Sequence, residues 1–141
     1  MPRPNNPKHK SIIVVDDYAT RDGKYANNTD AVSLSIGLAQ WDNDENEISG
    51  KVFRRKNGTW IRSSEELPLH RILDLSILTI SSFIISDTNN ESNKASESLN
   101  EEIINQDNIH FIQEQLISDN VNLLPRIKEL GRLIELFNNQ E

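Results

Sequence analysis

Lys51-Val-Phe-Arg-Arg-Lys-Asn-Gly-Thr-Trp-Ile-Arg62 is the stretch of sequence that decides the fold. Its centre, Asn57-Gly58, lies between two runs of strand-forming residues. This dipeptide favours a two-residue type I′ turn, because both central positions need positive φ. The stretch therefore predicts a β-hairpin in which the paired residues are Lys56 with Thr59, Arg55 with Trp60, Arg54 with Ile61 and Phe53 with Arg62.

Side chains alternate between the two faces of each predicted hairpin strand. One face, called here the cation–aromatic face, carries Lys51, Phe53, Arg55, Trp60 and Arg62. The other carries Ile48, Val52, Arg54 and Ile61, and we expect it to face the core. The stretch holds five cations and no acid, although the formal net charge of the chain is -7. Two interpretations stay open: a binding face for an anion, or a solvated face that opposes edge aggregation.

Composition limits the classes of function. The 141 residues fit one domain, and the absence of cysteine excludes disulfides, thiolate metal sites and cysteine nucleophiles. An acidic chain is not a general nucleic-acid binder, because phosphate neutralisation needs a basic surface. The apolar segment 67–85 is interrupted by His70, Arg71 and Asp74, so we expect a buried helix and no membrane span. We expect a cytoplasmic protein, and the heavy use of Asn, Ile, Ser and Lys favours a bacterial or phage origin.

The predicted fold class is α+β, with a small antiparallel sheet of three or four strands followed by three helices. Residues 1–10 are expected to form a flexible arm, and residues 11–141 a single domain with the sheet in residues 11–62. Residues 11–15 read as a short strand. Residues 32–41 alternate between apolar and small side chains, which predicts a half-buried strand. Matching its apolar face to the hairpin pairs Leu38 with Val52.

The helical part is expected over residues 64–137. Ser63 or Ser64 caps a first helix that ends near Ile85, with Glu65 and Glu66 in its first turn. Residues 87–98 read as a polar loop. The capping-box spacing of Ser98-Leu-Asn-Glu101 opens a second helix, which ends near Ser118. Asn122 caps the third.

The third predicted helix, residues 122–137, carries an apolar seam with 4-3-4-3 spacing, made of Leu123, Ile127, Leu130, Ile134 and Phe137. Such a seam packs against another helix. The partner helix lies either in the same chain or in a second copy, and we expect a homo-oligomer.

No catalytic or metal signature stands out in the sequence. Asp16 and Asp17 follow a predicted strand, so they are either an ordinary loop or, with Asp22 or Asp30, ligands for Mg²⁺. His70 and Asp74 lie four residues apart on one helical face. They form either an acid–base pair or a polar pair that fixes the helix to the sheet. We expect no cofactor, and an enzyme is the less favoured interpretation.

Several segments resemble a small bacterial family of unknown function over roughly residues 10–80. The resemblance rests on Lys24-Tyr25, Thr29-Asp-Ala31, Leu34-Ser-Ile-Gly-Leu-Ala-Gln-Trp41, Ile48-Ser49, Lys51-Val52, Trp60 and Ser64-Glu-Glu-Leu-Pro-Leu-His-Arg-Ile-Leu-Asp-Leu75. It implies no activity. It does draw attention to a polar cluster where the hairpin meets the first helix, made of Arg62, Glu65, Glu66, His70, Arg71 and Asp74.

The preferred hypothesis is non-catalytic binding or sequestration of a small anionic ligand, with a nucleotide signal as the leading class. Phage anti-defence proteins that sequester nucleotides offer an analogy of size and composition. Trp60 or Phe53 would stack a base, and the expected site is Lys51, Phe53, Arg55, Trp60, Arg62, His70 and Arg71. The alternatives are a protein-interaction module with an acidic partner and a metal-dependent hydrolase that uses Asp16 and Asp17.

Overall fold

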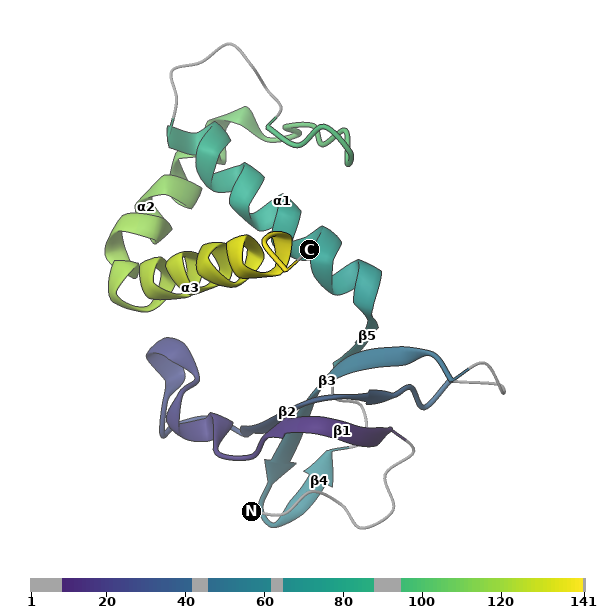
Figure 1. Cartoon of the computed structure of the whole chain (residues 1–141). Coiled ribbons are helices and arrows are strands. Elements are labelled where there is room, and N and C mark those ends of the chain that lie inside the picture. Colours follow the sequence, from purple (N-terminus) through teal and green to yellow (C-terminus); the bar gives the residue numbers. More distant parts are fainter. Residues whose placement is uncertain (1–8, 42–45, 62–64, 88–94, 141) are drawn as a thin grey trace. The chain divides into compact units, whose positions relative to one another are not determined.

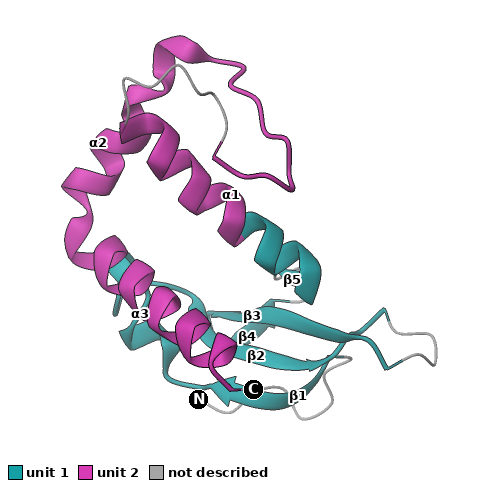
Figure 2. Cartoon of the chain, turned by 45° about the horizontal axis from the view of Figure 1, so that its top comes forward, with its two compact units in different colours: residues 1–75 teal, residues 76–141 magenta. Residues whose placement is uncertain are grey.

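The computed structural model describes residues 9–41, 46–61, 65–87 and 95–140. The chain divides into two compact units, residues 1–75 and residues 76–141 (Figure 2). Unit 1 contains an antiparallel sheet, and unit 2 contains helices (Figure 1). Helix α1 (Leu69–Asp87) begins in unit 1 and ends in unit 2. The predicted α+β class, a sheet followed by three helices, is confirmed.

The sheet contains five strands, of which two are only three residues long. They are β1 (Lys10–Val15), β2 (Ala31–Leu38), β3 (Ile48–Lys56), β4 (Thr59–Ile61) and β5 (Glu66–Pro68). The spatial order is β1-β2-β3-β4, and β5 also pairs with β3. The described structure starts at His9, whose side chain is fully buried. The first eight residues of the expected arm lie outside the described residues, and Lys10 belongs to the sheet.

The β3–β4 hairpin has the predicted register. Asn57 and Gly58 adopt φ of 53° and 79°, as a type I′ turn requires. Lys56 faces Thr59, Arg55 faces Trp60 and Arg54 faces Ile61. The fourth expected pair, Phe53 with Arg62, lies outside the described residues.

The predicted pairing of Leu38 with Val52 is wrong by four residues. Leu38 instead faces Ile48, and Val52 faces Leu34. The strands begin pairing directly after the connection between them, where the backbone N–H of Ala39 donates to Glu47 O at 2.9 Å. This register gains several ladder hydrogen bonds, and a shift of four leaves every side chain on its expected face.

The buried face of the sheet is the opposite of the expected one. On β2 the buried residues include Ser33 and Ser35, while Ile36 on the other face is 38% exposed. The side chains on the first face are small. Gly37 has no space even for a Cβ, because an added Cβ would lie 2.1 Å from Lys10 O. The apolar face instead carries an open cleft of about 420 Å³ that is lined by residues of unit 1, among them Leu34, Val52 and Ile72.

Helix α1 begins later than expected, at Leu69. Glu66 and its neighbours form β5, where Lys51 faces Glu66 and Ser49 faces Pro68. The residue before a proline is disfavoured in the helical region, so Leu67 stays extended and the helix starts after Pro68. The expected first-turn role of Glu65 and Glu66 is therefore wrong.

The second helix is also shorter than expected, because α2 covers only His110–Ser118. Asn100 has φ of 54°, which interrupts a helix. The carboxylate of Glu101 accepts hydrogen bonds from Ser81 and from the backbone N of Ser96, so the predicted capping box does not form. Helix α3 (Asn120–Asn138) starts two residues before the expected cap.

Helix α1 is long and apolar enough to cross a membrane, by length and composition alone. Its only buried residue among those described is Ser81, so the expected burial of this helix is not found within the chain. In α2 and α3 no described residue is buried.

Candidate functional site

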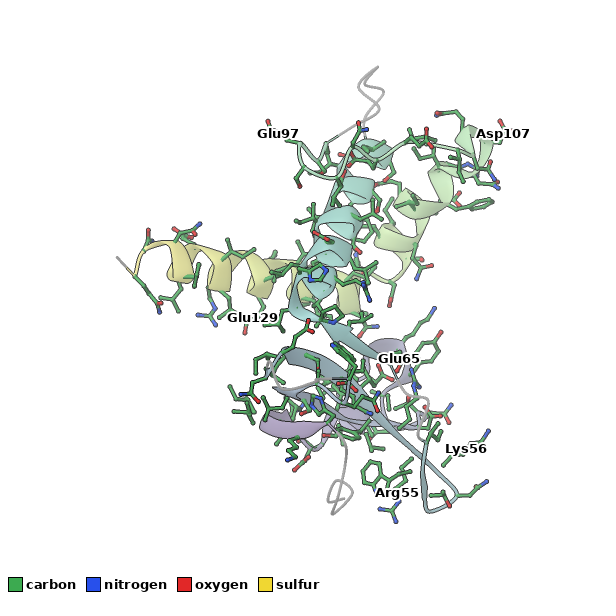
Figure 3. All side chains as sticks on the ribbon, turned by 90° about the vertical axis from the view of Figure 1, so that its right-hand side faces the viewer. Arg55, Lys56, Glu65, Glu97, Asp107 and Glu129 are labelled. Atoms are coloured by element: carbon green, nitrogen blue, oxygen red, sulfur yellow. The ribbon has the colours of Figure 1, made fainter. Side chains whose placement is uncertain are left out.

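The hairpin end of the cation–aromatic face pairs a cation with an aromatic ring. The Arg55 guanidinium lies 5.5 Å from the centre of the Trp60 ring. Both residues are half-buried, and the next residue, Lys56, is exposed. Figure 3 shows Arg55 and Lys56 near the turn of the β3–β4 hairpin. A guanidinium beside an indole suits an anionic group attached to a flat ring.

Two predicted site residues lie deeper in the sheet. Phe53 is 3% exposed, and its ring packs edge-on against His9 and Trp60 at centroid distances of 5.8 and 5.9 Å. The side chain of Lys51 is 8% exposed, and its Nζ lies 3.6 Å from Glu66 Oε1 and 5.0 Å from the Phe53 ring. Phe53 therefore packs beneath Trp60, and Trp60 is the more exposed of the two rings.

The remaining predicted residues do not join this pair. His70 and Arg71 are exposed in the first turn of α1, directly after β5. Pro68 pairs with Ser49, six positions along β3 from Arg55, which corresponds to about 20 Å of strand. Arg62 lies outside the described residues. The six predicted residues that the structure describes therefore form no single cluster.

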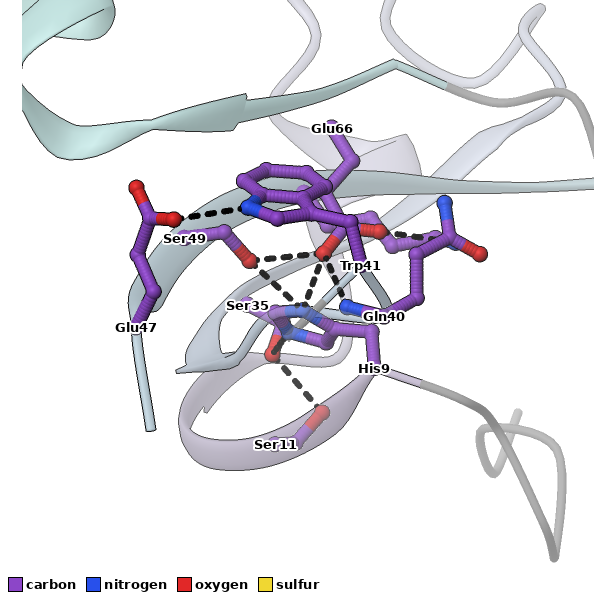
Figure 4. A network of polar contacts seen from close by, with 9 residues as sticks. His9, Ser11, Ser35, Gln40, Trp41, Glu47, Ser49 and Glu66 are labelled. Carbon is purple, nitrogen blue, oxygen red and sulfur yellow. Dashed lines mark hydrogen bonds and ion pairs between the residues drawn. The ribbon is translucent and has the colours of Figure 1, made fainter. Parts of the chain in front are cut away.

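A buried polar network centred on His9 lies beside Phe53 on the same face (Figure 4). His9 Nδ1 lies 2.9 Å from Ser49 Oγ and 3.1 Å from Glu66 Oε2, while Nε2 lies 2.8 Å from Ser35 Oγ. Glu66 Oε2 also accepts from Ser49 Oγ at 2.7 Å and from the backbone N of Gln40 at 3.1 Å. The network thus ties the residue before β1 to β2, β3 and β5.

Burial lowers the pKa of His9 below its ordinary value, although the hydrogen bond and the charge of Glu66 act in the opposite direction. Burial alone would raise the pKa of Glu66, but hydrogen bonds from Ser49, from the Gln40 backbone and from His9 hold it below its ordinary value. The stable combination at neutral pH is therefore a neutral imidazole beside a carboxylate. The imidazole donates from Nδ1 to Glu66, because a carboxylate can only accept.

The order Glu66, His9, Ser35 matches that of a hydrolase triad, in which a carboxylate orients the imidazole and the imidazole contacts a hydroxyl. The environment does not suit that chemistry. Ser35 is 4% exposed, and a hydrogen bond of 2.7 Å joins its hydroxyl to Ser11. A substrate carbonyl cannot reach Ser35 Oγ in this conformation, so the network serves the fold.

Three of the four acidic residues considered for Mg²⁺, namely Asp16, Asp17 and Asp30, have other partners. Asp17 accepts from Arg21 at 2.9 Å, and Asp16 accepts from Ser33 Oγ at 3.0 Å. Asp30 pairs with Arg54 at 2.5 Å, and Arg54 also pairs with Glu65 at 2.6 Å. Within the described part of the chain, no group of three histidine, aspartate or glutamate side chains is placed to hold a metal ion.

The network predicts loss of stability in acid. The pKa of His9 in the folded protein lies below the unfolded value of about 6.5, so the unfolded chain binds more protons as the pH falls below that value. The free energy of unfolding should fall by at most about 1.4 kcal/mol per pH unit for this group. Urea unfolding at pH 7.5 and pH 5.5, followed by tryptophan fluorescence, measures the difference.

A matched pair of variants isolates this effect. His9→Asn removes the titrating ring, and His110→Asn removes an exposed one. The pH difference in unfolding free energy should shrink in the first variant and persist in the second. An unchanged pH difference in His9→Asn would show that other groups cause the acid effect.

Sequence reasoning missed His9 because the preceding residues are polar and rich in proline. The available signal was the run of serines, Ser33, Ser35 and Ser49, on one sheet face. Hydroxyls on a buried face need partners. His9 and Glu66 are the partners of Ser35 and Ser49, and Asp16 is the partner of Ser33.

Comparisons with known proteins were informative at the level of the family. Residues 1–92 match the model of a protein family whose description is a family of unknown function (DUF6530). No curated protein and no solved structure matches the chain. The matched part holds the whole sheet, the His9 network and the Arg55–Trp60 pair. Because the match covers more than half of the chain, the protein belongs to this family of unknown function.

Proposed function

We propose that the protein binds a small anionic ligand without chemical change, with a nucleotide as the leading class, at the hairpin end of the cation–aromatic face. The observation that carries this proposal is the half-buried pair of Arg55 and Trp60, 5.5 Å apart. Arg55 would bind phosphate and Trp60 would stack on the base. The exposed Lys56 adds positive charge beside them.

Neighbouring carboxylates offset part of the positive charge in the hairpin sequence 51–62. Lys51 lies beside Glu66, and Arg54 is held by Asp30 and Glu65. Lys56 is exposed and Arg55 lies over the Trp60 ring, so these two cations suit a ligand at the hairpin end. We include cytoplasmic location in the proposal, since nucleotide signals act there.

A homo-oligomer is part of the same proposal. The described residues of α3 include Ile134 and Phe137, which are 52% and 73% exposed. Two or more copies would cover such side chains and bring several hairpins into one particle. Sequestration of an anion by a small acidic protein gains from this arrangement where two chains contribute their arginines to one ligand, because the pooled positive charge offsets the acidic background.

Melting temperatures with a panel of linear and cyclic nucleotides, with and without Mg²⁺, test the ligand. We expect at least one nucleotide to raise the melting temperature and to be recovered intact. Arg55→Glu should weaken its binding by about tenfold or more. Lys24→Glu is the matched control, because Lys24 also lies over an aromatic ring, 5.4 Å from the centre of Tyr25.

The control distinguishes a site from a general effect of charge. Equal weakening by both variants would mean that net charge alone attracts the nucleotide. Lack of any nucleotide effect would favour an acidic protein partner at this face, and turnover that needs Mg²⁺ would favour a hydrolase.

A further inference from the structure

Unit 2 contains a cleft that the proposed function does not use. Its volume is about 310 Å³. It is lined by residues of α1, of α2 and of the segment before α2, among them Leu78, Ile85, Ile103, Ile109 and Ile112. These side chains make most of its wall apolar, and the volume falls at the lower end of the range for small-molecule sites.

Two glutamates, Glu101 and Glu102, border this apolar cleft, and Glu101 is the one with a buried oxygen. Its Oε2 accepts hydrogen bonds from Ser81 Oγ and, at 3.1 Å, from the backbone N of Ser96. Its Oε1 is buried and has no hydrogen-bond donor among the described residues. The hydrogen bond from Ser81 holds the pKa of Glu101 below its ordinary value, so the group is ionised at neutral pH.

A buried carboxylate oxygen without a donor is unfavourable, because it has lost water and gained no partner. A molecule in the cleft that donates a hydrogen bond to this oxygen, after a rotation of the Glu101 side chain turns it toward the cleft, removes that penalty. The isoleucine side chains around it favour a hydrocarbon group on the same molecule. Anions are disfavoured, since the carboxylate repels them.

We propose that this cleft binds a small primary amine that carries an aliphatic group. The ammonium donates to Glu101 Oε1, and the aliphatic group packs against Ile103, Ile109 and Ile112. The site is independent of the hairpin, which selects the opposite charge. It is formed by residues 78–85 and 101–112, and most of its lining residues lie outside the segment that the family model matches. A bound water molecule is the competing occupant, because it satisfies the oxygen without using the apolar wall.

Titration of the full chain with n-hexylamine and with n-hexanol separates these occupants. Isoleucine methyl signals in NMR spectra report binding directly at the cleft. We expect saturable shifts with hexylamine and binding of hexanol that is about tenfold weaker or more, because the alcohol lacks the charge-assisted hydrogen bond. Equal binding of both probes, or no shift with either, would overturn the proposal.

Two variants of adjacent glutamates test the role of the carboxylate. Glu101→Gln should weaken hexylamine binding by about tenfold or more and leave hexanol binding unchanged. Glu102→Gln is the matched control, since Glu102 also borders the cleft but is exposed. Hexylamine affinity should stay within about twofold in this control. The same loss in both variants would assign the effect to general charge.

A third variant keeps the proposal open to refutation if Glu101→Gln fails to fold. Ile112→Phe places a larger side chain in the cleft and keeps the carboxylate. Its helix content, measured by circular dichroism, should match that of the wild type, and hexylamine binding should be lost. Wild-type affinity for hexylamine in a folded Ile112→Phe variant would show that the amine binds elsewhere.

Discussion

Replacement of Glu66 by alanine is expected to lower the free energy of unfolding by about 3–5 kcal/mol. The Glu66 side chain is 2% exposed. Its loss leaves His9, Ser49 and the backbone N of Gln40 without their shared acceptor and removes the charge beside Lys51. His9 and Ser49 are fully buried, so each of these two side chains then lacks both water and its acceptor. Because small domains are stable by only about 5–15 kcal/mol, the variant should unfold at a much lower urea concentration.

The neighbouring glutamate provides a matched control. Glu65 also forms an ion pair, with Arg54 at 2.6 Å, but its side chain is 53% exposed. An exposed pair of this kind contributes about 0–1 kcal/mol, so Glu65→Ala should change stability little. Urea unfolding followed by the fluorescence of Trp41 and Trp60 measures both variants. Equal effects in the two would show that the His9 network contributes nothing beyond an ordinary surface pair.

The parts of the fold that local sequence determines were predictable. Asn57-Gly58 has a strong conformational preference, and the register of β4 on β3 follows from that turn alone. The end of α3 was predicted to within one residue, at Phe137 instead of Asn138, because its apolar pattern stops there. The alternation of β2 also predicted correctly which of its residues share a face.

The choice of the buried face could not be made from local patterns. Alternating apolar residues normally mark the core, yet here Phe53 and the serines are buried while Ile36 is exposed. What decides the outcome is His9, which contacts Glu66 across 57 positions in the sequence. No periodicity reports a contact of that length. The prediction of the candidate site was inaccurate for the same reason. Phe53 and Lys51 were expected at the surface, but their side chains are buried in the sheet.

The start of α1 illustrates a conflict between two local rules. Serine and glutamate before Pro68 resemble a capped first turn, with the proline tolerated inside it. The backbone of Glu65 instead accepts from Val52 N at 2.9 Å, and the segment joins the sheet. Pairing with β3 satisfies backbone groups that a helix end would leave open, so tertiary structure prevails over the capping signal.

The exposed apolar side chains of unit 2 favour assembly with a second copy of the chain. The buried apolar residues among those described are Ala31, Ala39 and Phe53, all in unit 1. Helix α3 carries Val121, Leu133, Ile134, Leu136 and Phe137 at exposures of 46% or more. A helical unit gains most of its stability by burying an apolar stripe. The homo-oligomer that we propose supplies this burial from a second copy.

Light scattering is therefore expected to give a mass of at least twice 16.1 kDa. Ile134→Glu should reduce this mass to that of a single chain, because the substitution places a charge within the apolar contact, where burial without a partner costs more than the roughly 2–7 kcal/mol of a neutral polar group. In a monomer the same substitution would be nearly neutral, since Ile134 is 52% exposed. Lys128→Gln changes the net charge by the same amount at an exposed polar position of α3 and should leave the mass unchanged. A wild-type chain that is monomeric at all concentrations, and equally stable with Ile134→Glu, would remove the oligomer from the proposed function and leave a single hairpin site on each chain.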